Sequence, residues 1–279
     1  MCGEFFSPEI QPELERLGAW DAFLAAGPAR VRRMKLHFGI REKTSLLPEP
    51  AWGLSRYAFD ALMLDRACEL GAEVTSEERE TAVVAAGRRS GFSAARPRLF
   101  GFKAHFEGPA DDAVELFFFQ GCYVGINCVE GGITNVCGLG PEDALKKIAF
   151  DYDRLESPAL AERLKPLKRS MKWMSTGPLH YCQNFEPAAK QYFAGDALSF
   201  VDPFTGSGLL ASVKTGALAG AAAANREPVD EYLARCRKSL KQPFQVASLL
   251  RKAVDSGWAD RFAGAIPGRL LFALTRPHQ

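Results

Sequence analysis

The sequence predicts an α/β (or α+β) protein in which an antiparallel sheet is inserted between helical ends. Apolar residues recur with a helical period over 54–72, and four strand-like runs lie between 98 and 139. A third observation is a helix of small residues that follows the Gly-x-Gly at 206–208. With 279 residues, the chain can form one large or two modest domains with a real core.

The first elements follow from caps and periodicity. Ser7 and Pro8 indicate a helix start, and that helix is expected to continue through 12–27. The run VRRMKLHFG at 31–39 favours a strand. The helix over 54–72 is expected to end at Gly71, and a short apolar strand follows at 82–85.

The middle of the chain is rich in strands and in phenylalanine. Turn residues separate the runs RLFGFKAHF, AVELFFFQ, CYVGINCVE and GITNVCGL, which predicts an antiparallel meander. Many of the 20 Phe residues fall here. They indicate either an apolar sheet core or an apolar substrate cavity lined from the same sheet.

The remaining elements are mostly helical. Helices are expected at 141–152 and 158–167, a strand at 189–197, and then the small-residue helix. A long helix over 227–254 completes this part of the chain.

Composition limits the classes of function. Hydrophobic residues make up 47%, charged residues 24%, and the formal net charge is +2, so nothing suggests a nucleic-acid partner. The seven Cys residues form no C-x-x-C and no zinc-type spacing with the four His, which predicts no metal site and reduced thiols in a cytoplasmic protein. The start shows no secretory signal, and 258–279 is expected to be a packed helix or a peripheral membrane contact.

Two stretches near residue 200 carry candidate binding chemistry. Gly195 ends a predicted strand where a backbone can pass close to a ligand, and the Asp196 carboxylate suits the hydroxyls of a sugar or ribitol chain. Pro203 fixes a bend, after which Gly206 and Gly208 expose backbone N–H groups at a helix start. Spacing alone leaves two alternatives, a ligand cradle and a tightly packed helix without a ligand.

The motif GDALSFVDPFTGSGLLASVKTGALAGAAA resembles the C-terminal flavin-binding motif of the FAD-dependent monooxygenase and geranylgeranyl reductase superfamily, the para-hydroxybenzoate hydroxylase-like flavoproteins. Further stretches resemble that family in the same order. They are MCGEFFSPEIQPELERLG, GLSRYAFDALMLDRACELGAEV, VVAAGRRS (with Ala86 where many members have Asp) and ELFFFQGCYVGINCVEGGITNVCGL. The resemblance covers most of the chain.

The resemblance implies an FAD site and a division into domains. Asp196 would bind ribityl or ribose hydroxyls, and the backbones of Gly208 and Leu209 would face the flavin pyrimidine edge. Arg56 would lie along the cofactor, and Cys2 would lie near the reacting face. It implies a partial Rossmann-like FAD-binding domain at 1–96 and 176–225. A substrate-binding sheet at 97–175 and C-terminal helices at 226–279 would complete the chain.

The family's G-x-G-x-x-G loop for the ADP part of FAD does not occur in these 279 residues, and the link between Val74 and Val83 is short. Three explanations stay open: a truncated sequence, a short protein that binds FAD weakly or not at all, and an apolar-ligand module without redox chemistry. A partial Rossmann core would leave an apolar face open, which predicts marginal stability or an oligomer.

The resemblance therefore implies an FAD-dependent oxidoreductase, of reductase or monooxygenase type, acting on a small apolar substrate. It leaves open whether NAD(P)H is the electron donor. The alternative is a non-catalytic apolar-ligand-binding remnant that does not hold FAD.

Overall fold

The computed structural model describes residues 2–39, 41–77, 79–87, 98–179, 182–183, 185, 190–200 and 206–240. Pro203 and the segment 258–279 lie outside the described residues. In chain order the elements are β1 (Phe5–Phe6), α1 (Ile10–Leu17), α2 (Trp20–Ala25), β2 (Ala29–Phe38), β3 (Arg41–Gly53), α3 (Arg56–Glu69), β4 (Val83–Val84), β5 (Leu99–Glu107), β6 (Ala113–Phe119), β7 (Cys122–Cys128), η1 (Glu130–Gly132), β8 (Thr134–Pro141), α4 (Glu142–Lys147), η2 (Tyr152–Arg154), α5 (Pro158–Leu164), β9 (Lys168–Arg169), β10 (Met174–Leu179), β11 (Cys182–Gln183), β12 (Tyr192–Phe193), η3 (Gly195–Ala197), β13 (Ser199–Phe200) and α6 (Gly208–Asn225). Residues 229–240 are also helical.

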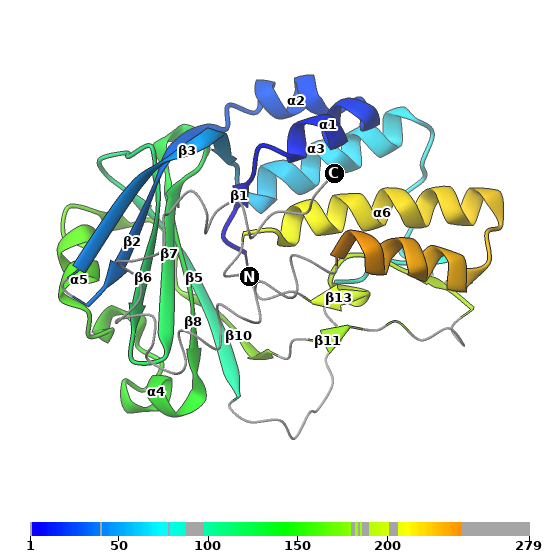
Figure 1. The fold of residues 1–279 in the computed structure, drawn as a ribbon. Coiled ribbons are helices and arrows are strands. Elements are labelled where there is room, and N and C mark those ends of the chain that lie inside the picture. The colour runs from blue at the N-terminus through cyan, green and yellow to red at the C-terminus, as the bar shows by residue number, and fades with distance from the viewer. Residues whose placement is uncertain are drawn as a thin grey trace.

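A large mixed sheet dominates one side of the molecule (Figure 1). Its strands lie in the order β1-β3-β2-β6-β7-β8-β5-β10, with β9 paired to the end of β5. The sheet therefore extends beyond the segment 97–175, because it includes β2 and β3 from the first part of the chain. The α/β fold class that the sequence predicts is confirmed.

The predicted meander of four consecutive strands is wrong in one pairing. β6, β7 and β8 pair in sequence, but β5 pairs with β8, and β6 lies parallel to β2. The link after β5 explains the difference. Arg33 of β2 donates to Asp112 at 2.6 Å, and the backbone N–H of Arg32 donates to the Asp112 carbonyl at 2.7 Å, so this link delivers β6 to β2.

Both faces of the large sheet are covered. One face packs Val31, Leu36 and Tyr123 together with Phe5 of β1. The opposite face packs Phe102, Phe117 and their neighbours under α4 and α5. The phenylalanine-rich runs thus supply core residues on both faces, as one of the two alternatives predicts.

The other side of the molecule consists of helices α1, α2, α3, α6 and residues 229–240 (Figure 1). The single helix expected after Ser7 is two helices, because Gly18 takes a left-handed φ of 65° and ends α1. The helix expected at 54–72 is confirmed as α3, and the Ser55 side chain accepts from the Ala58 N–H at its start. None of the described helices is long and apolar enough to cross a membrane.

A short parallel strand pair connects two distant parts of the sequence. Val83 and Val84 of β4 pair with Tyr192 and Phe193 of β12. β12 leads directly into η3, and both pack on α6 and on residues 229–240. The pair therefore positions the Gly195-Asp196 turn against the start of the small-residue helix.

Candidate ligand cavity and its polar wall

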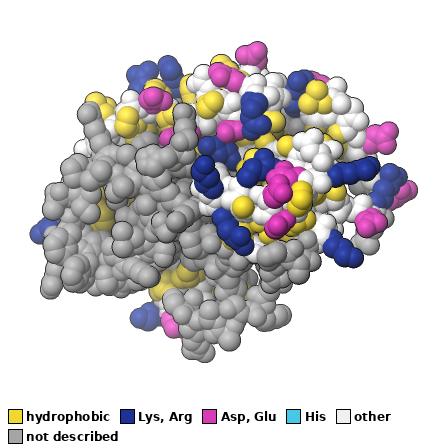
Figure 2. Space-filling model, turned by 45° about the vertical axis from the view of Figure 1, so that its right-hand side comes forward, with side chains coloured by type: hydrophobic (Ala, Val, Ile, Leu, Met, Phe, Trp, Pro, Cys, Tyr) yellow, Lys and Arg dark blue, Asp and Glu magenta, His cyan; other side chains and the backbone are white. Residues whose placement is uncertain are grey.

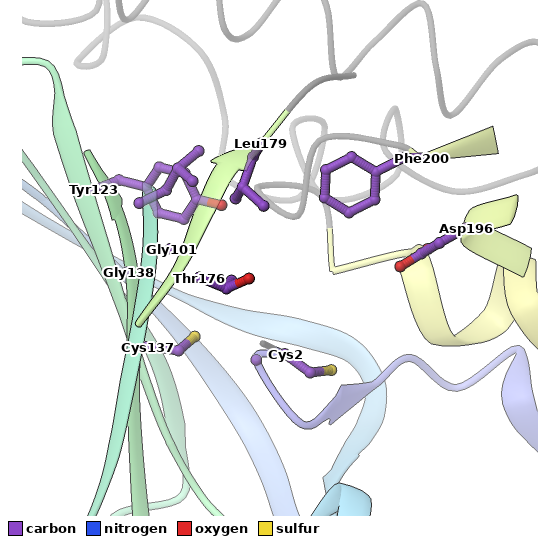
Figure 3. A pocket seen from close by; sticks show the side chains of 11 residues that line it. Cys2, Gly101, Tyr123, Cys137, Gly138, Thr176, Leu179, Asp196 and Phe200 are labelled. Carbon is purple, nitrogen blue, oxygen red and sulfur yellow. The ribbon is translucent and has the colours of Figure 1, made fainter. Parts of the chain in front are cut away.

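A cavity of about 210 Å³ lies between the large sheet and η3 (Figure 3). On one side of the cavity lie Cys137 and Tyr123 of the sheet. On the opposite side lie Asp196 of η3 and Phe200 of β13 (Figure 3). The complete lining is Cys2, Gly3, Gly101, Tyr123, Cys137, Gly138, Leu139, Thr176, Leu179, Asp196 and Phe200. Leu139, Leu179 and Phe200 make part of this wall apolar. Its ionisable or hydrogen-bonding side chains are one carboxylate (Asp196), two hydroxyls (Tyr123 and Thr176) and two thiols (Cys2 and Cys137).

The structure places two of the predicted site residues, Cys2 and Asp196, in the wall of this cavity. Gly195 adopts a φ of 59°, which favours glycine, and its N–H donates to the Thr215 hydroxyl at 2.9 Å. A Cβ on Gly195 would lie 3.2 Å from the Ser212 hydroxyl oxygen. The turn is therefore held tightly against α6, and this packing fixes the position of the Asp196 backbone.

The Gly-x-Gly turn lies beside the N-terminal strand. Gly206 has a φ of 62°, and a Cβ there would be 2.9 Å from the Phe5 ring. At Gly208, the first residue of α6, a Cβ would meet no atom within 4 Å, whereas the Leu209 side chain is buried in the helical core. Among the described residues, none would therefore crowd a side chain at Gly208, at the point where α6 begins with N–H groups that have no partner within the helix.

Arg56 does not line the cavity. It borders a separate groove of about 720 Å³ between α3 and α6, which Leu209, Gly216 and Gly220 also line. Its Nε donates to Asp60 at 2.7 Å and one terminal nitrogen donates at 2.8 Å, so Asp60 takes two of its five N–H donors.

Sequence reasoning missed a buried charged cluster behind Cys2. The Glu4 carboxylate pairs with the Lys103 ammonium and lies 2.8 Å from Nε2 of His105. Lys103 and His105 are two residues apart on β5, so the strand period places both on one face. That spacing is the signal that could have identified them, because 99–106 contains no other charged or polar side chain.

Burial and charge set the protonation of these groups. Burial raises the pKa of the Cys2 thiol, and burial raises the pKa of the Cys137 thiol to about 12, so both thiols keep their protons at neutral pH. Burial alone would raise the pKa of Glu4, but hydrogen bonds from His105 and Lys103 bring it below the ordinary value. The wall therefore combines neutral thiols with an ionised carboxylate behind them.

No metal centre is evident in the described part of the chain. There, no three His, Cys, Asp or Glu side chains come together in a group that could hold a metal ion.

No protein-family model and no curated protein matches this sequence, whereas solved structures do. A triple mutant of the flavin-dependent brominase Bmp2 matches with a TM-score of 0.74 at 19% identity, over 99% of this chain and 84% of the brominase. A flavoprotein/dehydrogenase from Cytophaga hutchinsonii gives a TM-score of 0.72 at 15% identity, over 99% of this chain and 80% of that one. PqsL from Pseudomonas aeruginosa, described as a probable FAD-dependent monooxygenase, gives 0.65 at 14% identity, over 97% and 88%.

At these identities the likeness concerns the fold. The chain has the fold of flavin-dependent halogenases and monooxygenases, as the resemblance of its motifs to that superfamily predicts.

Proposed function

We propose that this protein is an FAD-dependent oxidoreductase that acts on a small apolar substrate. The observation that carries the proposal is the arrangement around the cavity. The Asp196 carboxylate borders it, and α6 begins twelve residues later at Gly208, where a Cβ would meet no described atom within 4 Å. A helix start offers free N–H donors and the positive end of the helix dipole, which suit the polar edge of a flavin ring.

The residues fit one half of the cofactor better than the other. Asp196 and Gly206 to Leu209 would hold the ribityl chain and the flavin ring, and the groove beside Arg56 has room for more of the cofactor. The backbone N–H groups at the start of α3, however, already have protein carboxylates as partners. The Arg56 N–H donates to Glu4, and the Ser55 N–H donates to Glu130. These 279 residues contain no G-x-G-x-x-G loop of the kind that binds a pyrophosphate.

When bound, a flavin supplies hydride transfer or oxygen activation, and the protein contributes position and electrostatics. The cavity walls would orient an apolar substrate and exclude water from it. A volume of about 210 Å³ suits a compact substrate, because an engineered cavity of about 150 Å³ holds benzene.

The rate at which the reduced, flavin-loaded protein reacts with oxygen in a stopped-flow experiment distinguishes a reductase from a monooxygenase. A fast reaction supports a monooxygenase, and a slow one supports a reductase.

The test of the cofactor is purification in the presence of FAD followed by a titration of flavin fluorescence. We expect micromolar binding by the wild type and about a tenfold to hundredfold loss in Asp196→Asn, since a hydrogen bond to a charged group is worth ~1.5–3 kcal/mol. Asp65→Asn is the matched control, because Asp65 is exposed on the helix α3. Absence of flavin binding by the wild type would refute the enzymatic proposal.

A second candidate is an apolar-ligand-binding protein without redox chemistry. The apolar wall formed by Tyr123, Leu139 and Leu179 favours it, as does the missing G-x-G-x-x-G. A protein that binds no flavin but binds a fluorescent apolar dye would support this candidate, provided that Leu179→Trp abolishes the dye signal.

A further inference from the structure

The Glu4 side chain is 2% exposed and has a charged or polar partner at each carboxylate oxygen. Oε1 accepts the Arg56 N–H at 2.8 Å and pairs with the Lys103 ammonium. Oε2 lies 2.8 Å from Nε2 of His105. One carboxylate therefore connects the first turn of α3 with the strand β5 of the large sheet.

The backbone of Glu4 is held as firmly as its side chain. Its carbonyl oxygen accepts from the Leu54 N–H at 3.2 Å and from the Asn127 amide at 3.4 Å. Its own N–H donates to Sγ of Cys2 at 3.3 Å. The φ of 53° is left-handed for a residue with a Cβ, a conformation that persists only where surrounding contacts impose it.

We propose that Glu4 is a positioning residue that holds the Cys2 thiol in the wall of the cavity. Its carboxylate anchors the N-terminal segment to β5 and α3, and its N–H reaches the thiol itself. This role is independent of flavin, because it concerns only the geometry of the cavity wall, and its test does not depend on the proposed function.

Charges from several elements face Cys2, and they make the proposal measurable. Burial is the largest influence on the pKa of Cys2 and raises it. The hydrogen bond from the Glu4 N–H and the cations Arg56 of α3 and Lys103 of β5 lower this pKa, while the charge of the Glu4 carboxylate raises it. Cys137 of β8 and Asp196 of η3 share the cavity with it. Loss of the Glu4 charge would leave Lys103 without its carboxylate partner, whereas Arg56 keeps Asp60, and would favour the thiolate.

The experiment measures the alkylation rate of Cys2 by iodoacetamide as a function of pH, resolved by peptide mass spectrometry. In Glu4→Gln we expect a lower midpoint of the pH profile and roughly tenfold faster modification at neutral pH, as a shift of one pH unit gives. The exposed Cys68 serves as an internal reference whose rate stays the same.

Glu130→Gln is the matched control, because Glu130 also accepts an N–H at the start of α3, from Ser55 at 2.7 Å. A merely structural effect on α3 would change the Cys2 profile in both variants, whereas a positioning role changes it only in Glu4→Gln. The double variant Glu4→Gln/Lys103→Met removes both charges and should return the midpoint toward that of the wild type.

An unchanged Cys2 profile in Glu4→Gln, or an equal change in Glu130→Gln, would overturn the proposal. If Glu4→Gln does not fold, Lys103→Met decides, since it leaves the Glu4 charge less compensated. The Cys2 midpoint should then rise and alkylation should slow. A lower or unchanged midpoint in that variant would contradict the role assigned to Glu4.

Discussion

Glu115 lies 2% exposed on β6, on the far side of the sheet from the ligand cavity, and it anchors α5. Its carboxylate accepts from Nε of Arg163, while Lys35 and His37 approach it from β2. Burial alone would raise the pKa of Glu115, but the nearby His37, Arg163 and Lys35 bring it below the ordinary value. Its stabilising contribution is therefore present above the ordinary carboxyl range and is lost as pH falls through the lower folded-state pKa.

Arg163→Met should destabilise the protein by about 3 kcal/mol at neutral pH, because it leaves a buried carboxylate without its closest cation. It should also raise the pKa of Glu115, so that less stability is lost on acidification than in the wild type. Urea unfolding at several pH values measures both effects. Arg154→Met is the control, since its side chain is 69% exposed and its ion pair should contribute less than about 1 kcal/mol. Equal effects of the two substitutions would contradict this account.

At the scale of elements, α6 combines a buried face with a face of small residues along the groove. Thr215 and Ala219 are buried, whereas Gly216 and Gly220 line the groove and would give a Cβ no neighbour within 4 Å. Packing among the described residues thus does not require these glycines. They nevertheless lower the stability of the helix, because glycine loses more conformational entropy than alanine on helix formation.

Gly216→Ala should stabilise the protein by about 1 kcal/mol, which is the difference in helix propensity between the two residues. Gly138→Ala should destabilise it by about 1–3 kcal/mol, because a Cβ there would lie 2.3 Å from the Phe102 ring and 2.8 Å from the Tyr123 carbonyl oxygen. Chemical denaturation of both variants tests this prediction. A lower free energy of unfolding for Gly216→Ala would contradict the prediction, because it would mean that other atoms pack against this face of α6.

Local sequence signals predicted where helices and strands form better than which strands pair with each other. The apolar period over 54–72 predicted α3, and turn residues separated the strands correctly. The parallel pairing of β6 with β2 is accompanied instead by ion pairs between Arg33 and the Asp111–Asp112 link, which are more than 75 residues apart in sequence. The Glu4 cluster also escaped prediction, since its partners come from segments that only the folded chain brings together.

At the scale of the whole molecule, the described helices mix charges of both signs with apolar side chains on the face shown in Figure 2. The cavity and the groove flank the same N-terminal segment, which contributes Cys2 to one while Arg56 beside it borders the other. A ligand that enters either space therefore contacts a segment connecting the sheet with the helices, and binding should stabilise the molecule as a unit.

FAD at about 100 times its dissociation constant should add ~2.7 kcal/mol to the free energy of unfolding. Each kcal/mol should raise the melting temperature by roughly 2–4 °C. Flavin mononucleotide should give nearly the same shift, because the 279 residues hold no G-x-G-x-x-G loop for the ADP part. Thermal scans with each ligand, and with ADP as the control, measure the effect. Stabilisation by FAD and ADP but not by flavin mononucleotide would contradict the assignment of the flavin half to this chain.

The contacts of Glu4 also bear on how the chain folds during synthesis. Its partners Lys103, His105 and Asn127 follow it by roughly a hundred residues, so this carboxylate leaves the ribosome long before they do. At about 5–20 residues per second, the N-terminal segment stays solvated for several seconds or more before it can dock. The carboxylate of Glu4 can therefore reach Lys103 and His105 only after β5 has been synthesised.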